Sequence, residues 1–225
     1  MKNRILCLSI FFFSCSLVFG QLGISAAYFK MNAPNWGDYG AEICKDGFFS
    51  GVVYWFPEKK YRVDLRLKIF FGHTGQEQFT ATAGERAGEI WRANSTFLGI
   101  RGNVRFYFFD WEGDCNCPTW SKRGDVFKKG FFVQFGPTAA MLKFEAEIEN
   151  FGVEEKFSSS ETLYGLNIGA GIDLGLSELI TLTPYFAAEY LHDVDSNCEN
   201  CLPAEGSSYL MSAQFGLHLG LRWQK

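Results

Sequence analysis

The chain has 225 residues, of which 47% are hydrophobic and 17% aromatic, and its 25 acidic residues outnumber its 21 basic ones. A net charge of −4 argues against a nucleic-acid partner, because nucleic-acid binding calls for a basic patch. The length suits a single domain, and 24 glycines with only 6 prolines favour many strands and turns over helices.

The N-terminus has the pattern of a secretory signal peptide. Lys2 and Arg4 precede a short apolar run, and small residues lead up to Gly20. We therefore expect residues 1–20 to be a signal peptide that is cleaved after Gly20. The apolar run is too short for a spanning helix, which needs about 20 residues. An uncleaved anchor and a lipoprotein signal ending at Cys15 are the alternatives.

The mature chain, residues 21–225, contains eight stretches that are typical of β-strands. In chain order they are Gly23–Met31, Phe48–Phe56, Tyr61–Phe71, Thr96–Phe109, Gly130–Leu142, Leu163–Leu176, Ile180–Leu191 and Tyr209–Trp223. Successive side chains of a strand point to opposite faces, and most of these stretches have one apolar face and one polar or small face. The first stretch alternates weakly, so its facing is uncertain, and the second is apolar on both faces.

Four charged residues share one face of the third stretch: Arg62, Asp64, Arg66 and Lys68. Burying them in an ordinary soluble core would carry a large desolvation penalty. A hydrated lumen accepts them, with the opposite apolar face turned to lipid. Apolar faces recur on at least six strands, more than a small soluble lumen can hold. The sequence therefore predicts an all-β fold, an eight-stranded antiparallel transmembrane β-barrel.

Connections in such a barrel alternate between outer loops and inner turns. The predicted outer loops are 32–47, 73–95, 149–162 and 192–208, and the predicted inner turns are 57–60, 110–129 and 177–179. The turn 110–129 is long for that side. Pro137 and Pro184 fall inside strands, where a missing N–H breaks the ladder, so bulges are expected there. The fifth strand continues beyond the membrane with an acidic rim, Glu145, Glu147 and Glu149.

Three segments and the glycine- and aromatic-rich last strand carry a resemblance to a known family. The segments are LGIRGNVRFYFFD (Leu98–Asp110), GFFVQFGPTAAML (Gly130–Leu142) and GLNIGAGIDLGL (Gly165–Leu176). The chain resembles the outer membrane protein beta-barrel domain family of Gram-negative bacteria, sometimes called PorT-like. The resemblance implies an eight-stranded outer-membrane barrel without a shared catalytic set, surrounded by lipid and inserted by the barrel-assembly machinery. The chain departs from the usual terminal aromatic residue, because Trp223 is followed by two more residues.

The predicted lumen carries a charge network. Its expected members are Arg62, Asp64, Arg66, Lys68, Arg101, Arg105, Asp173, Glu189, His218 and Arg222. One interpretation is a basic lumen that passes or binds anions, and the other is a salt-bridge network that fills a narrow barrel. Eight strands leave an interior just wide enough for side chains, which favours the salt-bridge network.

Two further groups of residues have predicted roles. The interface aromatics of the membrane-spanning strands are expected to be Tyr61, Tyr164, Tyr190, Tyr209 and Trp223. Export permits disulfides, and Cys198–Cys201 is the candidate bond, with a redox pair or half of a zinc site as alternatives. The pairing of Cys44, Cys115 and Cys117 stays open, and no metal or cofactor is expected.

The favoured function is an integral outer-membrane protein that meets protein partners through its loops. No catalytic activity is expected, since no motif fixes a Ser–His–acid constellation and Ser207, Ser208 and Glu189 qualify by position alone. The first alternative is a narrow anion or solute transport or binding barrel. The second is a soluble exported lipocalin-like barrel, in which the apolar faces point inward around a ligand.

Overall fold

The computed structural model describes residues 21–32, 46–58, 63–74, 77–80, 90–108, 130–150, 153–177, 179–193 and 209–221. The expected signal peptide and loop cysteines lie outside these residues. The strands are β1 Gln21–Asn32, β2 Asp46–Glu58, β3 Val63–Thr74, β4 Glu77–Thr80, β5 Ile90–Phe106, β6 Phe131–Asn150, β7 Val153–Ile172, β8 Leu174–Gly175, β9 Ile180–Asp193 and β10 Tyr209–Leu221. No helix in this part of the chain is long and apolar enough to cross a membrane.

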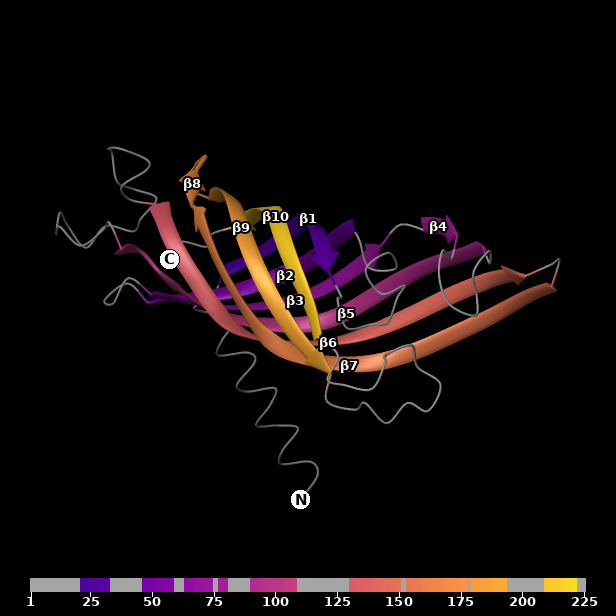
Figure 1. Cartoon of the computed structure of the whole chain (residues 1–225). Coiled ribbons are helices and arrows are strands. Elements are labelled where there is room, and N and C mark those ends of the chain that lie inside the picture. Colours follow the sequence, from indigo (N-terminus) through magenta and orange to yellow (C-terminus); the bar gives the residue numbers. More distant parts are fainter. Residues whose placement is uncertain are drawn as a thin grey trace, which may run out of the picture.

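The strands close into an antiparallel barrel (Figure 1). The first and last strands are partners, with pairs running from Leu22–Leu221 to Asn32–Met211. β7 and β8 form a single barrel strand, because both pair with β9 in the same register on either side of Asp173. β4 is an addition at the edge of β5. Among the described residues this makes eight barrel strands, so the predicted fold class is confirmed.

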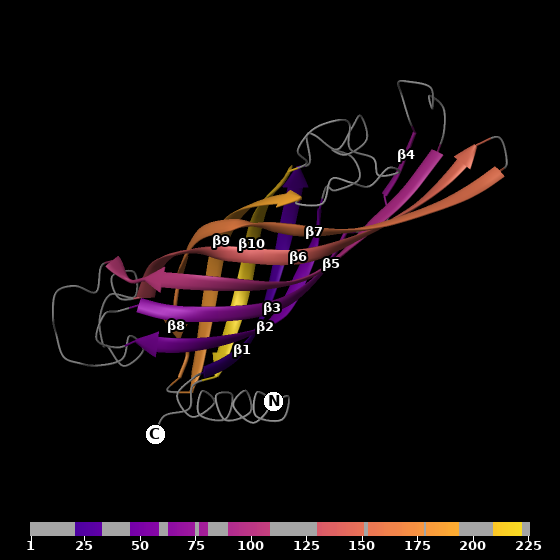
Figure 2. The ribbon, with the colours of Figure 1, turned by 90° about the horizontal axis from the view of Figure 1, so that it is seen from below.

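The two ends of the barrel differ. We call the end that holds Gln21 and Leu221 the termini end, and the opposite end, where β6 and β7 turn back, the hairpin end. β5, β6 and β7 extend beyond the other strands at the hairpin end, with β4 beside them (Figures 1 and 2). Most barrel strands have 12 or more residues, enough for the 9–11 that a tilted membrane strand requires.

Side chains alternate strictly between the interior and the outer surface. In β1 every second residue is buried, so Phe29 and Met31 point inward while Ile24 and Tyr28 point outward. This settles the facing that the weak sequence pattern left uncertain. In β2 the inward residues include Phe49 and the outward ones include Phe48, which explains why both faces of this strand are apolar in sequence.

Two predicted outer loops contain strand instead. Residues 149–150 and 153–162, assigned to a loop, continue β6 and β7 as a hairpin with pairs out to Asn150–Val153. The segment 73–95 includes the end of β3, all of β4 and the start of β5. The sequence pattern failed here because a strand outside the membrane is under no pressure to alternate apolar with polar residues. The predicted projection of β6 is present, and β7 is its partner.

Neither proline produces the predicted bulge. Pro137 pairs with Leu166 of β7, and Pro184 pairs with Leu217 of β10, with no inserted residue on either strand. Each proline instead coincides with a gap in the ladder on its other side, since the β5–β6 pairs skip from Arg101–Thr138 to Val104–Phe135. The second gap lies opposite Pro184, at the break between β7 and β8. A missing N–H therefore interrupts pairing here without changing the register.

Candidate functional site

The half of the interior toward the termini end is filled by ionisable side chains, which we call the charged layer. Its members are Asp64, Arg66, Lys68, Arg101, Arg105, Asp173 and Glu189. They come from β3, β5, β9 and the break between β7 and β8, at inward positions of each strand. The sequence placed all of them in the lumen. Two further predicted members, Arg62 and Arg222, lie outside the described residues.

Arg101 is the centre of this layer and is 2% exposed. Its Nη2 donates to both carboxylate oxygens of Glu189, at 2.6 and 2.7 Å, and its Nη1 donates to Oε1 of Gln214 at 3.1 Å. Gln214 Nε2 in turn donates to Glu189 at 2.8 Å, so the three side chains form a closed ring. Sequence reasoning missed Gln214, although its inward position in the last strand was visible from the alternation.

Asp173 organises a second cluster closer to the termini end. Arg66 and Arg105 form ion pairs with its carboxylate at 3.5 and 3.4 Å, and Thr183 donates a hydrogen bond to it. The hydroxyl of Tyr107 lies 2.7 Å from Asp173 and 2.7 Å from Asp64. Because this hydroxyl has a single proton, it can donate to only one of the two carboxylates at a time. Asp173 sits at the break in the strand, where its own N–H donates to the carbonyl of Gly130.

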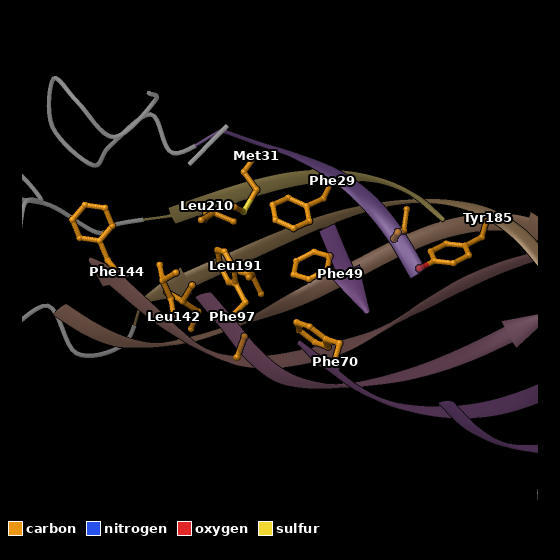
Figure 3. Close-up of a cluster of buried hydrophobic side chains, with 14 of the residues drawn as sticks. Phe29, Met31, Phe49, Phe70, Phe97, Leu142, Phe144, Tyr185, Leu191 and Leu210 are labelled. Atoms are coloured by element: carbon orange, nitrogen blue, oxygen red, sulfur yellow. The ribbon is translucent and has the colours of Figure 1, made fainter. Parts of the chain in front are cut away.

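The half toward the hairpin end is filled by hydrophobic side chains, which we call the apolar layer (Figure 3). Its members are Ala27, Phe29, Met31, Phe49, Phe70, Ala93, Phe97, Ala140, Leu142, Phe144, Leu163, Ala187, Leu191 and Leu210. The same hydrophobic cluster continues among the charged side chains through Tyr107, Phe132 and Tyr185. Phe49 is its hub, with ring centroids 4.1 Å from Phe29 and 5.2 Å from Phe70. The sequence did not predict this layer, since Phe70 alone stood out among the charges of its strand.

A small cavity lies within the charged layer. Its volume is about 30 Å³, and its wall includes Arg66, Lys68, Arg101, Arg105 and His218. No carboxylate is among the residues that line it. Several buried polar atoms at this wall lack a hydrogen-bond partner, namely Nε and Nη1 of Arg66, Oδ1 of Asn103 and both ring nitrogens of His218. His218 is 2% exposed and packs edge-on against Trp55, with ring centroids 5.1 Å apart.

The outer surface is apolar around the barrel. Ile24 of β1, Ile69 of β3 and Phe215 of β10 are 62, 56 and 61% exposed. Each barrel strand contributes such residues, among them Phe48, Val52, Leu98, Ile100, Phe135, Met141, Leu166, Ile168 and Phe186. A monomeric soluble protein rarely exposes more than a few hundred square ångströms of contiguous apolar surface. Lipid is the environment in which this belt is stable, so the chain is a membrane-spanning barrel.

Aromatic residues gather near the hairpin end of the belt. Tyr164 and Tyr190 point outward, and Tyr190 stacks on half-buried Tyr209 with a centroid distance of 5.6 Å. Tyr28, which sequence reasoning missed because the facing of β1 was uncertain, lies at the same end and donates to Asp46 at 2.7 Å. The other two predicted interface aromatics, Tyr61 and Trp223, are outside the described residues.

The hairpin of β6 and β7 carries charged side chains beyond the belt. Lys143 pairs with Glu145 at 2.6 Å, and Lys156 donates to Glu147 across the hairpin at 2.8 Å. The hydrogen bond from Lys156, with the charge of that ammonium, lowers the pKa of Glu147 from its ordinary value of 4.5. Glu149 also belongs to this strand by backbone position.

The remaining predicted sites fall outside the described part of the chain. Cys198 and Cys201, together with Cys44, Cys115 and Cys117, are not among the described residues, and neither are Ser207 and Ser208. Within the described ranges, no three His, Cys, Asp or Glu side chains are grouped as metal ligands. The disulfide and its alternatives therefore stay predictions.

Comparison with known proteins identifies the fold. No family model matches the chain, and a comparison with curated proteins found no match either. Among solved structures, a major outer membrane protein of Thermus thermophilus is similar with a TM-score of 0.52 and 10% identity, over 89% of this chain and 99% of that one. Neisserial surface protein A (TM-score 0.45, 11% identity, 91% and 97% coverage) and Ail of Yersinia pestis (0.45, 13%, 91% and 99%) also match. The chain has the fold of an integral outer-membrane β-barrel.

Proposed function

We propose that this protein resides in the bacterial outer membrane and acts there through its exposed surfaces, as a structural or partner-binding protein without catalytic activity. The observation that carries the proposal is the arrangement of the two faces of the barrel. The outer face is an apolar belt, and the interior is filled by the apolar and charged layers. With the interior occupied, the surfaces left for a function are those beyond the membrane.

The filled interior argues against a solute channel and against a lipocalin-like barrel. The apolar layer closes the hairpin half of the lumen with large side chains such as Phe97 and Leu142, both 1% exposed, so a continuous water path for a solute has no room. A lipocalin-like barrel needs apolar residues inside around a ligand and polar residues outside. Here the outer surface is apolar, with Ile69 56% exposed, and the apolar part of the interior is filled by the protein's own side chains.

The hairpin end is the part of the molecule best suited to meet a partner. β5, β6 and β7 rise beyond the belt as a sheet with charged side chains on its surface, including Lys143, Glu145, Glu147 and Lys156. We place this end outside the cell and the termini end in the periplasm, since both chain ends of such barrels lie there. The partner is a protein whose surface complements this charged sheet.

Three finer assignments belong to the same proposal. We assign the chain to the PorT-like group on the strength of the glycine and aromatic pattern of Leu98–Asp110, Gly130–Leu142 and Gly165–Leu176. We expect the signal peptide to be cleaved after Gly20 and the barrel-assembly machinery to insert the protein. Mass spectrometry of the mature N-terminus tests the cleavage directly, since the mature chain should begin at Gln21.

Gel mobility of protein from washed outer membranes tests the proposed location. A folded barrel resists SDS without heating, so the unheated sample should migrate faster than the heated one. Recovery of the protein in the soluble periplasmic fraction, with no shift between the two samples, would contradict the proposal. If the protein is in the membrane fraction but no partner binds its hairpin end in a pull-down experiment, the location is supported and the partner-binding role is rejected.

A further inference from the structure

The charged layer holds more positive than negative charge. Four of its described members are cations and three are carboxylates. Each arginine has a carboxylate partner: Arg101 pairs with Glu189, and Arg66 and Arg105 share Asp173. Within the described residues Lys68 has no carboxylate in ion-pair range. Its ammonium lies 3.3 Å from the hydroxyl of Tyr185 and about 6 Å from the ring centroids of Phe70 and Tyr185, and none of these groups carries a negative charge. An uncompensated charge buried to this degree, with Lys68 7% exposed, is strongly unfavourable.

The cavity lies where this imbalance is concentrated. All four cations line its wall, and the three carboxylates do not. Arg66 lines the cavity, and two of its nitrogens, Nε and Nη1, have no hydrogen-bond partner, although its guanidinium also lies over the ring of Trp55. Its side chain is 5% exposed. The imidazole of His218 adds a further N–H that lacks an acceptor. Leaving buried donors of this kind unpaired is unfavourable, so the wall favours a bound hydrogen-bond acceptor.

We infer that a single monovalent inorganic anion, of the size of a halide, binds in this cavity. One negative charge balances the one excess positive charge of the layer. The volume of about 30 Å³ exceeds the minimum for a single water and is too small for an organic anion. The anion accepts hydrogen bonds from Arg66 and His218 and lies within the field of Lys68. This site goes beyond the proposed surface role and does not depend on it.

The cavity could instead hold a bound water molecule, and water and an anion differ in two testable ways. Water satisfies unpaired N–H groups but leaves the charge of Lys68 uncompensated, whereas an anion does both. The occupancy of the cavity by water also does not depend on which anion the buffer contains. Dependence of stability on a small anion, at constant ionic strength, therefore distinguishes them, because a ligand that binds only the folded state stabilises it in proportion to its occupancy.

Crystals of the full barrel grown with sodium bromide give the direct test. We expect an anomalous bromide peak within hydrogen-bonding distance of Arg66 in wild-type protein. In Lys68→Met, which removes the excess charge while keeping most of the side-chain volume, the peak should be absent. A wild-type cavity that contains only water, or no density, would overturn the inference whether or not the variant folds.

Thermal unfolding of the detergent-folded barrel gives a second, independent test. Replacing chloride by gluconate at equal ionic strength should lower the melting temperature of the wild type, because gluconate is too large for the cavity. Lys68→Met should melt at the same temperature in both salts. Lys143→Met removes an exposed cation from β6 and should keep the wild-type response to chloride. Equal melting of the wild type in both salts, or an equal shift in Lys68→Met, would contradict an anion held by Lys68.

Discussion

The ring of Arg101, Glu189 and Gln214 places an ion pair where water does not reach. The side chains of Arg101 and Glu189 are 2% and 1% exposed, so water cannot solvate either ion if its partner is lost. Removing one partner of a buried pair is far more costly than never having the pair, because the survivor keeps its charge in a poorly solvating interior. Removing either Arg101 or Glu189 alone would therefore leave the other as an unpaired buried charge.

Replacing Glu189 by Gln should destabilise the barrel by about 3–5 kcal/mol, the cost of a stranded buried charge. Urea unfolding in lipid vesicles, followed by tryptophan fluorescence, measures this change. The double variant Arg101→Met with Glu189→Met should lose less than the single variant, since no charge is stranded. A double variant that is less stable than Glu189→Gln would show that the ring stabilises by more than mutual neutralisation.

The pair of Lys143 and Glu145 is the matched exposed control. Its side chains are 58% and 49% exposed, and its N–O distance of 2.6 Å equals that of the buried pair. Lys143→Ala should change stability by no more than about 1 kcal/mol, because solvent screens the interaction. The same urea experiment serves for both, so a large effect at Lys143 would reject the explanation by burial.

Glu147 should respond to acid in a defined way. Its pKa is lowered by the hydrogen bond and charge of Lys156, so its favourable contribution is present at neutral pH. That contribution is lost as the pH falls below 4.5 through the lowered value. Lys156→Gln should raise the pKa of Glu147 back toward 4.5, as measured by NMR titration of its carboxyl carbon. An unchanged titration would mean that Lys156 does not hold the carboxylate in solution.

At the level of strands, β5 and β6 leave little space where their ladder is interrupted. A Cβ added at Gly136 would collide with the backbone carbonyl oxygen of Gly102, which cannot move aside as a flexible side chain could. A Cβ at Gly102 would meet nothing nearer than Pro137 Cγ, at 3.9 Å. Two glycines at the same gap in the ladder thus differ completely in the space around their Cα atoms.

Gly136→Ala should therefore impair folding, whereas Gly102→Ala should be tolerated. The first change forces β5 and β6 apart, and the second adds a methyl group at ordinary van der Waals distance and restricts the unfolded chain. The fraction of protein that migrates as the compact unheated form on SDS gels measures the difference. Equal folding yields for the two variants would show that the gap between these strands yields to a methyl group.

The β6–β7 hairpin is a separate element from the barrel. On the hairpin side of residue 163, β7 has no partner in β9, so the ribbon is supported only by β6 and β5. Replacing residues 147–156 by an Asn-Gly turn joins Ala146 to Phe157, which already face each other. The shortened protein should keep its heat-dependent gel shift and lose binding of any partner that contacts the hairpin. Loss of the gel shift would show that the ribbon is needed to close the barrel.

For the molecule as a whole, the packed interior predicts a closed barrel. Purified protein in planar bilayers should show no steady conductance, since the apolar layer leaves no aqueous path. Replacing the hub residue Phe49 and its neighbour Phe97 by Ala together would remove two large rings from that layer. Conductance that appears only in this double variant would show that the apolar layer closes the lumen. Steady conductance of the wild type would contradict a closed barrel.

The alternation of the sequence was sufficient to predict the barrel and the side on which most strand residues lie. It placed Arg66, Lys68 and Arg101 inside because a strand fixes side-chain direction by position alone. It could not predict that Arg101 meets Glu189, or that Phe29 meets Phe97, since contacts across a lumen depend on tilt and stagger of the strands. The projection of β6 was predicted, but the β7 half of the hairpin was assigned to a loop, because outside the membrane a strand need not alternate apolar with polar residues.

The pairing of β1 with β10 joins segments from the two extremes of the chain. Nearly the entire polypeptide must therefore be made before the ring of hydrogen bonds can shut. A product that stops before Tyr209 would not be a slightly smaller barrel. It would be an open sheet with two unpaired edge strands, β1 and β9, whose free backbone N–H and C=O groups can pair with other chains. Truncation near the C-terminus is thus a route to aggregation, whatever function the missing residues serve.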